Sequence, residues 1–249
     1  MATNFANDLL ASEPQARRRL SFEHRFFLTV ALIFPVIVVA GYAPTYYFKP
    51  LFNTPPLPSL LVHVHALVMT TWVLLYVVQT VLVSARRVKL HMTLGLFSIG
   101  LAGAVIVVGA MTAIAMLARG ASVPGIPPAQ FFVIPAVDLI VFPIIYGAAI
   151  YLRKRPADHK RLMLLTSVYF FGPAVARFPF AFVQQLGPLW FFGVPSLCAV
   201  VLLAIDTYRN GKLNRAFAAG TALMIASVPI RMALAQTAAW ERFTTWLVS

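Results

Sequence analysis

Residues 59–117 decide the fold: SLLVHVHALVMTTWVLLYVVQTVLVS, then ARRVKLHM, then TLGLFSIGLAGAVIVVGAMTAIAML. Each outer part is an apolar run longer than the about 20 residues that an α-helix needs to cross the hydrocarbon core of a bilayer. The short connection between them carries Arg86, Arg87 and Lys89. Two long apolar runs with a basic connection are typical of a helical hairpin that crosses a membrane twice.

The same pattern recurs along the whole chain. Apolar runs of this length are separated by short stretches rich in proline, glycine or basic residues, and no stretch between them is long enough for a soluble domain. The sequence predicts an all-α polytopic membrane bundle, residues 26–236, with seven transmembrane helices near 26–45, 59–84, 93–117, 130–152, 162–184, 188–208 and 215–236.

Composition agrees with a protein embedded in lipid. Of 249 residues, 60% are hydrophobic and 11% are charged, whereas soluble domains average about 45–50% apolar and about 25% charged residues. The net charge of +13 could suggest nucleic-acid binding, but the basic residues lie in the connections, so no nucleic-acid partner is expected and the lipid bilayer is. A single cysteine, Cys198, excludes an internal disulfide and a cysteine-based metal site.

The basic residues also predict the orientation. Lys and Arg are retained on the cytoplasmic side of membranes, and most of them fall before span one and in alternate connections: Arg17, Arg18, Arg19, Arg25, Arg86, Arg87, Lys89, Arg153, Lys154, Arg155, Lys160, Arg161, Arg209, Lys212 and Arg215. The opposite side has only Lys49, Arg119 and Arg242. The N-terminal segment 1–25 is therefore expected inside and the C-terminus outside.

The two ends of the chain have features of a signal peptide and of an interfacial helix. Residues 17–43 have the basic start, apolar run and small residues of a signal peptide, but the run is long and more spans follow, which favours a retained first helix. Residues 237–249 carry Trp240 and Trp246. Because tryptophan prefers the membrane–water interface, this tail is predicted to be an amphipathic segment on the outer surface.

Polar residues open the outward-running spans at the predicted inner surface. His24, His91, His159 and Asn214 each stand beside basic residues at such a position, which indicates tandem helical hairpins formed by spans two–three, four–five and six–seven. The histidines could form a cytoplasmic ligand cluster, or they could cap helix starts and meet lipid phosphates. Asn214 in place of histidine favours the structural hypothesis.

Three charged residues lie deep in the spans. Counted from the inner helix ends at 1.5 Å per residue, Asp138, Arg177 and Arg231 lie at about 21, 22 and 24 Å, a single level in the outer half of the bilayer. Asp138 and Arg177 are expected to pair across one hairpin, which leaves Arg231 in need of an anion. Prolines that free backbone carbonyls flank all three: Pro135, Pro143, Pro173, Pro179 and Pro229.

His63 and His65 lie near the outer end of span two. Two positions apart on a helix, they point about 200° apart, so both cannot face one pocket. Haem b is a candidate cofactor with one of them as axial ligand. A second axial histidine within the chain is lacking at that depth, so a five-coordinate haem or a shared one in a dimer would be required.

A resemblance to known proteins rests on several residues between about 60 and 180. They are His63, His65, Ala66, Trp72, Gln79, His91 and Gly95, followed by His159-Lys160-Arg161-Leu162-Met163-Leu164-Leu165, Gly172-Pro173-Ala174 and Arg177. In these the chain resembles a widespread set of uncharacterised bacterial multi-span membrane proteins. The resemblance implies a bacterial inner membrane and no particular activity.

The function predicted from these features is binding of a small anionic or lipid-like ligand, as a sensor, transporter or accessory subunit. The predicted outward-facing site comprises Asp138, Arg177, Arg231, His65 and His63. A haem-binding redox protein, with His63 or His65 on the metal and the arginines on the propionates, is the first alternative. An assembly factor without ligand is the second. No nucleophile–base pair or phosphate-binding loop is present, so the sequence does not favour an enzyme.

Overall fold

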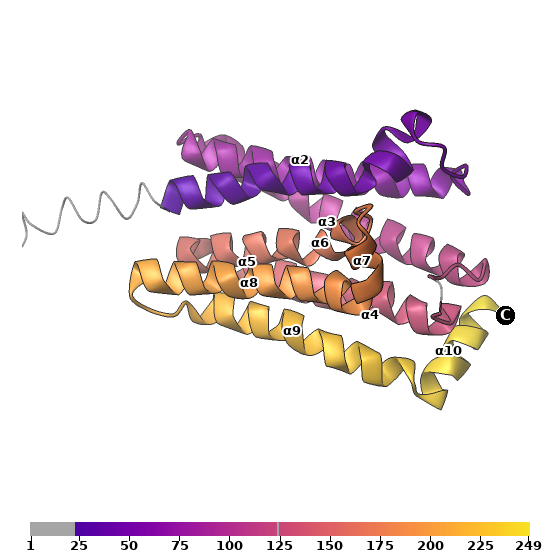
Figure 1. Ribbon diagram of the computed structural model, residues 1–249. Helices are drawn as coiled ribbons and strands as arrows, with labels where there is room; N and C mark the ends of the chain where they lie inside the picture. Colours follow the sequence, from indigo (N-terminus) through magenta and orange to yellow (C-terminus); the bar gives the residue numbers. More distant parts are fainter. Residues whose placement is uncertain (1–22, 124) are drawn as a thin grey trace, which may run out of the picture.

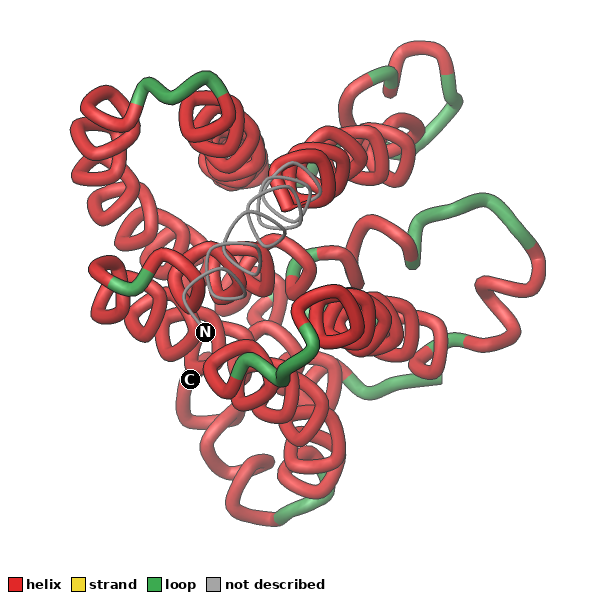
Figure 2. Tube along the Cα trace, turned by 90° about the vertical axis from the view of Figure 1, so that its left-hand side faces the viewer, coloured by secondary structure: helices red, strands yellow, loops and turns green. Residues whose placement is uncertain are grey.

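A computed structural model describes residues 23–123 and 125–249, and in these residues the secondary structure is entirely helical (Figure 2). The helices run roughly along one direction and pack into a bundle (Figure 1). Segment 1–22, with Arg17, Arg18 and Arg19 of the predicted cytoplasmic end, lies outside the described residues. The prediction of an all-α helical bundle is confirmed.

Six helices of the described chain are long and apolar enough to cross a membrane. They are Glu23–Tyr47, α2 (Leu60–Ser84), α3 (Val88–Ala118), α4 (Pro128–Tyr151) extended by η3 (Leu152–Lys154), α8 (Pro188–Asn210) and α9 (Arg215–Ala235). Each overlaps one of the predicted spans. The largest shift is at α3, which begins at Val88 rather than near residue 93, because the basic start of the run is already helical.

The predicted fifth span is not one helix. Over 162–184 the chain forms α5 (Pro156–Tyr169), α6 (Phe171–Val175) and α7 (Ala181–Leu186), with non-helical backbone around Phe178–Phe180. The prediction of a continuous helix there is therefore wrong. Proline supplies no backbone N–H and disfavours helical backbone in the residue before it, so Pro173 and Pro179 explain why helix breaks cluster here.

The bundle turns its large apolar side chains outward as well as inward. Leu60, Met92 and Leu96 expose 78%, 66% and 71% of their surface, while Arg161, Asp206 and Arg231 are buried. Apolar side chains outside and paired charges inside suit a hydrocarbon surrounding rather than water. Together with the six long helices, this distribution makes the chain a multi-span membrane protein.

Neighbouring helices in the sequence pack side by side, as the hairpin prediction requires: α2 with α3, α4 with α5, and α8 with α9. Between these pairs, α4 and α5 also pack against α9. Part of the core is aromatic, because the Trp72 ring meets the rings of Phe142 and Tyr146 at 5.1 and 5.4 Å. Tyr146 also shares a 2.8 Å hydrogen bond with Ser98 of α3.

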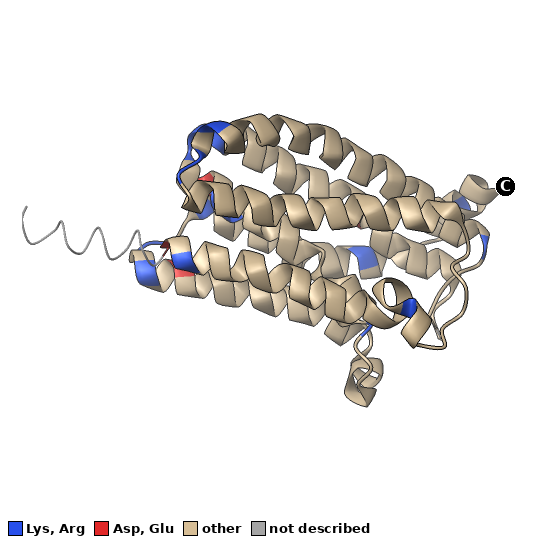
Figure 3. Ribbon diagram, turned by 90° about the horizontal axis from the view of Figure 1, so that it is seen from above, with Lys and Arg blue, Asp and Glu red and all other residues tan. Residues whose placement is uncertain are grey.

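The two ends of the bundle differ in charge. Lys and Arg gather at the end of the bundle where the described chain begins, and few occur at the other end (Figure 3). At that other end the tail forms α10 (Ala238–Val248). Trp240 anchors it by donating a 2.7 Å hydrogen bond to the carbonyl of Ala129 and stacking on Phe132, whereas Trp246 is 70% exposed.

The first helix approaches α6 through a glycine. A Cβ added to Gly41 would lie 2.1 Å from the carbonyl oxygen of Ala174. Gly41→Ala should therefore force the two segments apart and lower the free energy of unfolding by about 1–3 kcal/mol.

Gly103→Ala is the matched control, because nothing lies within 4 Å of a Cβ at that helical position. It should leave stability unchanged or raise it slightly, since alanine is the better helix former. Thermal unfolding of the purified variants in detergent compares them. Equal melting temperatures for the two variants would contradict the close contact.

Candidate functional site

Arg231 forms the centre of the deep charged cluster. Its side chain is 2% exposed, and its guanidinium donates to five acceptors: Asp138 Oδ1 (2.9 Å), the Tyr169 hydroxyl (2.9 Å), Ser227 Oγ (3.0 Å), and the carbonyls of Ser227 (3.2 Å) and Ile134 (3.4 Å). A guanidinium has five N–H donors. The protein itself satisfies all of them.

Asp138 completes the cluster. Its Oδ1 accepts from Arg231 and, at 2.6 Å, from the hydroxyl of Tyr169. The three side chains come from α4, α5 and α9, so one polar cluster ties three helices together in the middle of the bundle. Phe192 of α8 covers the guanidinium, with its ring centroid 4.9 Å from Cζ.

This geometry corrects the expected pairing. Asp138 and Arg231 do lie at one level, as the residue counts predicted, but Asp138 pairs with Arg231 and not with Arg177. Arg231 consequently does not need an external anion. The adjoining cavity, lined by Gly172, Phe191 and Ser196 among others, has a volume of about 20 Å³, which suits about one water molecule. The cluster has the geometry of a contact between helices rather than of a binding site for an organic ligand.

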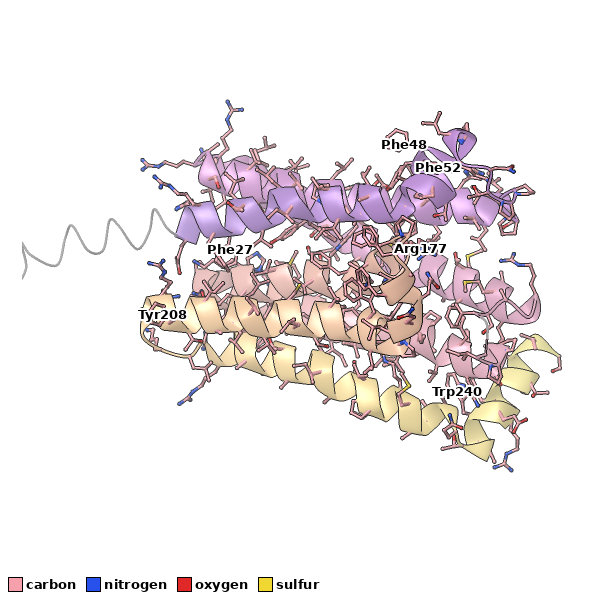
Figure 4. All side chains as sticks on the ribbon, viewed as in Figure 1. Phe27, Phe48, Phe52, Arg177, Tyr208 and Trp240 are labelled. Carbon is pink, nitrogen blue, oxygen red and sulfur yellow. The ribbon has the colours of Figure 1, made fainter. Side chains whose placement is uncertain are left out.

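Arg177 lies apart from this cluster, in the interrupted segment after α6 (Figure 4). Its Nη1 donates to the carbonyl of Pro173 at 2.6 Å, and its guanidinium stands 4.4 Å from the ring centre of Tyr42. It is also close enough to His65 for the two to interact electrostatically. The close contact of Gly41 with Ala174 brings Tyr42 to this position. Of the predicted site residues, the structure thus groups Arg177 with His65.

His63 lines a different site, a cavity of about 650 Å³. Phe52, another lining residue, lies at the end of the bundle away from the N-terminal start of the described chain (Figure 4). The cavity is lined by Tyr46, Tyr47, Lys49, Pro50, Phe52, Asn53, Thr54, Leu57 and His63. Tyr46 and His63 contact each other, with 3.3 Å between the hydroxyl oxygen and Nδ1. His63 is thus separated from His65, as their spacing on the helix predicted.

A turn of π-helix shapes this cavity. The first helix ends in η1 (Ala43–Tyr47), followed by η2 (Lys49–Leu51). Such wider turns occur frequently at functional sites. The Lys49 ammonium donates to Thr54 Oγ1 at 3.0 Å, to the carbonyl of Thr54 at 2.5 Å, and to the carbonyl of Pro55, so it fixes the loop that forms one wall of the open cavity.

The arrangement of these residues does not support the haem hypothesis. Arg231, one of the two residues expected on the propionates, is fully occupied by Asp138, Tyr169 and Ser227. The two candidate axial ligands lie in different surroundings, and the lining of the outer cavity contains one histidine, His63. These residues do not form a fitted haem site.

The sequence analysis missed a second buried ion cluster at the basic end. Arg161 of α5 makes a two-pronged contact with Asp206 of α8, at 2.8 and 2.7 Å, and its Nη2 reaches Glu23 at 3.1 Å. Lys160 pairs with the other oxygen of Glu23 at 2.5 Å. The signal for it was present, since Asp206 is an acidic residue inside an otherwise apolar span.

Comparison with known protein families, with curated proteins and with solved structures gives no match for the chain. The class is therefore defined by the fold alone: a multi-span helical membrane protein.

The Asp138–Arg231 contact can be measured as a coupling. Removing one partner leaves a buried unpaired charge, so Asp138→Asn and Arg231→Gln should each cost about 3–5 kcal/mol of stability. The double variant should recover much of that loss. Unfolding free energies of the four proteins in detergent give the coupling energy, and independent, additive losses would refute the pair.

Arg177→Gln is the control for this cycle. Arg177 is exposed and its one hydrogen bond is to a backbone carbonyl. Its loss should cost clearly less than that of Arg231, and Asp138→Asn combined with Arg177→Gln should show no coupling.

Proposed function

We propose that the chain is an inner-membrane protein of a bacterium that binds a small anionic, lipid-like ligand at its outer face. The proposal includes seven crossings, with the interrupted segment α5–α7 as the fifth, the N-terminus inside and the C-terminus outside. The placement of the basic residues supports this orientation. The sequence resemblance to bacterial membrane proteins supports a location in the bacterial inner membrane.

The topology is tested with reporter fusions. A reporter that is active only in the cytoplasm should be active after Lys89, Arg155 and Lys212 and inactive after Pro56, Ala121 and Ser249. The pair flanking the interrupted segment is decisive. If the fusion after Arg155 is active and a fusion after Gly187 is active too, then α5–α7 does not cross and the chain has six spans.

The single observation that carries the ligand proposal is the outer cavity. Its volume of about 650 Å³ lies within the about 300–1,000 Å³ of small-molecule sites. Among the described residues, Lys49 makes no ion pair with a carboxylate, and its three hydrogen bonds go to neutral oxygens. These bonds use the three N–H donors of the ammonium, but no carboxylate compensates its positive charge, so Lys49 favours an anion at the cavity wall through its charge.

The lining suits a molecule with an acidic head and an apolar body. Lys49, His63 and Tyr46 offer a cation, an imidazole and a hydroxyl for the head, while Tyr47 and Phe52 offer aromatic surface for the body. Ligand sites commonly combine a mainly apolar lining with a few polar groups that fix orientation. An amphipathic carboxylate is the chemical class that we assign to this site.

His63→Gln tests the site, and His65→Gln is the matched control two residues away on the same helix. The probe is a panel of short-chain and aromatic carboxylates together with their uncharged amides, measured by equilibrium dialysis against the purified protein. Loss of a hydrogen bond to a charged group costs about 1.5–3 kcal/mol, so His63→Gln should weaken carboxylate binding at least about tenfold.

His65→Gln should bind the carboxylates as the unaltered protein does, and the amides should bind to neither variant. If the amides bind as tightly as the acids, the ligand is not an anion. If His65→Gln weakens binding as much as His63→Gln, the ligand lies elsewhere and the cavity is not its site.

A further inference from the structure

Two imidazoles meet at the basic end of the bundle, far along the helices from the outer cavity. His91 lies in the first turn of α3 and His159 in the first turn of α5. Their ring centres are 6.3 Å apart, with the ring planes at 74°, and both residues are half-buried. Residues 68 positions apart in the chain are thus brought together by the packing of two hairpins.

Capping does not explain these histidines. The residues that precede α3 and α5 are Arg87 and Arg155, and neither helix start has a side-chain cap. Asn214 does cap its helix, since its Oδ1 accepts from the backbone N–H of Phe217 at 2.8 Å. Asn214 therefore has a capping role that the two histidines lack. Its presence in place of a histidine is no longer an argument that His91 and His159 are structural.

A hydrogen bond to the backbone fixes the orientation of the His159 ring. Nδ1 lies 2.9 Å from the carbonyl oxygen of Ala149. Because a carbonyl can only accept, Nδ1 carries a proton, and Nε2 is the nitrogen that offers its lone pair to a metal in the neutral ring. A backbone carbonyl on the far nitrogen is the usual second contact of a metal-binding histidine, because it fixes the tautomer and orients the ring.

His91 and its neighbour Gln79 both present buried atoms that lack a partner. Nδ1 of His91 and Oε1 of Gln79 have no hydrogen bond within the described chain. The two residues lie together: the His91 imidazole interacts with the backbone of Gln79, and the Gln79 amide faces Gly95, one turn after His91. Leaving a buried polar atom unpaired costs about 1–3 kcal/mol, so such atoms call for an explanation such as a bound ion.

We propose that His91 and His159 bind a copper ion between them, with the amide oxygen of Gln79 as a third ligand. A metal–nitrogen bond of about 2.0–2.1 Å places the metal about 3.2 Å from a ring centre, so two rings can share an ion when their centres are up to about 6.4 Å apart. The observed 6.3 Å fits a wide angle between the ligands.

Copper is favoured by the ligand set. Within the described residues, no three side chains of His, Cys, Asp or Glu gather as a metal site, which argues against sites that need several anionic ligands. Imidazole suits copper, zinc, iron and nickel, and among these divalent ions copper binds most tightly to a given nitrogen site.

The neighbouring cations permit a metal here. Lys160 and Arg161, which follow His159 directly, are paired with Glu23 and Asp206. The other basic side chains of this end that the structure describes, such as Arg86 and Lys89, are exposed. Water and salt weaken the repulsion between exposed charges and a bound ion, with a screening length of about 8 Å at physiological ionic strength.

The experiment uses the full chain without a histidine tag, stripped with a chelator and titrated with copper alone. Bound metal is measured by mass spectrometry of the metal after gel filtration. About one ion per chain is expected, and His91→Asn and His159→Asn should each weaken binding at least about 100-fold, more than the loss of an outer-shell contact. His63→Asn, at the other end of the molecule, is the control and should retain the ion.

Electron paramagnetic resonance of Cu²⁺ in the unaltered protein adds a reading that does not depend on folding of the variants. Hyperfine coupling to two imidazole nitrogens is the expected signature. A protein that retains no copper overturns the proposal, as does a spectrum without imidazole coupling. Variants at His91 and His159 that bind like the unaltered chain would place the metal elsewhere.

Discussion

The structure depends on one constraint: in the hydrocarbon core no water is present to satisfy a polar group. Arg231 shows how fully the chain meets it, because each of its five donors has an acceptor on α4, α5 or α9 itself. Ser227 lies on the same helix as Arg231, but the acceptors of Asp138, Ile134 and Tyr169 are in place only when the three helices are packed. The same requirement explains the buried contact of Arg161 with Asp206. Two charged clusters, one toward each end of the bundle, thus hold the helices together. Apolar contact alone would do this poorly, because an apolar helix surface packs about as well against lipid as against another helix.

The sequence was sufficient for the long helices and for the height of the deep charges, but not for their partners. Counting residues along a helix gives depth, and Asp138 and Arg231 meet at the depth expected. The direction in which a side chain points around its helix depends on how the helices pack. In this packing Asp138 points toward Arg231, and Arg177 lies beside Tyr42. The spacing of His63 and His65 did encode direction, and the two histidines are separated as it indicated. The outer cavity was beyond prediction, because the π-turn at Ala43–Tyr47 leaves no hydrophobic pattern.

The three places that the sequence analysis joined into one pocket have different chemistry. In the Asp138–Arg231–Tyr169 cluster, every donor of the Arg231 guanidinium has an acceptor. Arg177 is exposed at a helix interruption, and His63 lines a roomy cavity with Lys49. At the basic end, His91 and Gln79 keep unpaired buried atoms. The paired groups around Arg231 tie helices together, whereas the outer cavity and the unpaired atoms at the basic end are the places left for binding.

The helices also differ in length, with a consequence for the surrounding lipid. The 31 residues of α3 extend about 46 Å, and the 21 residues of α9 about 31 Å. Both helices expose apolar side chains, Ile230 in α9 and Leu96 in α3 among them. Lipid beside α9 therefore meets a lower apolar wall than lipid beside α3. Because bilayers thin or thicken to match such walls at modest cost, the protein should deform its annulus unevenly and collect shorter acyl chains on one side.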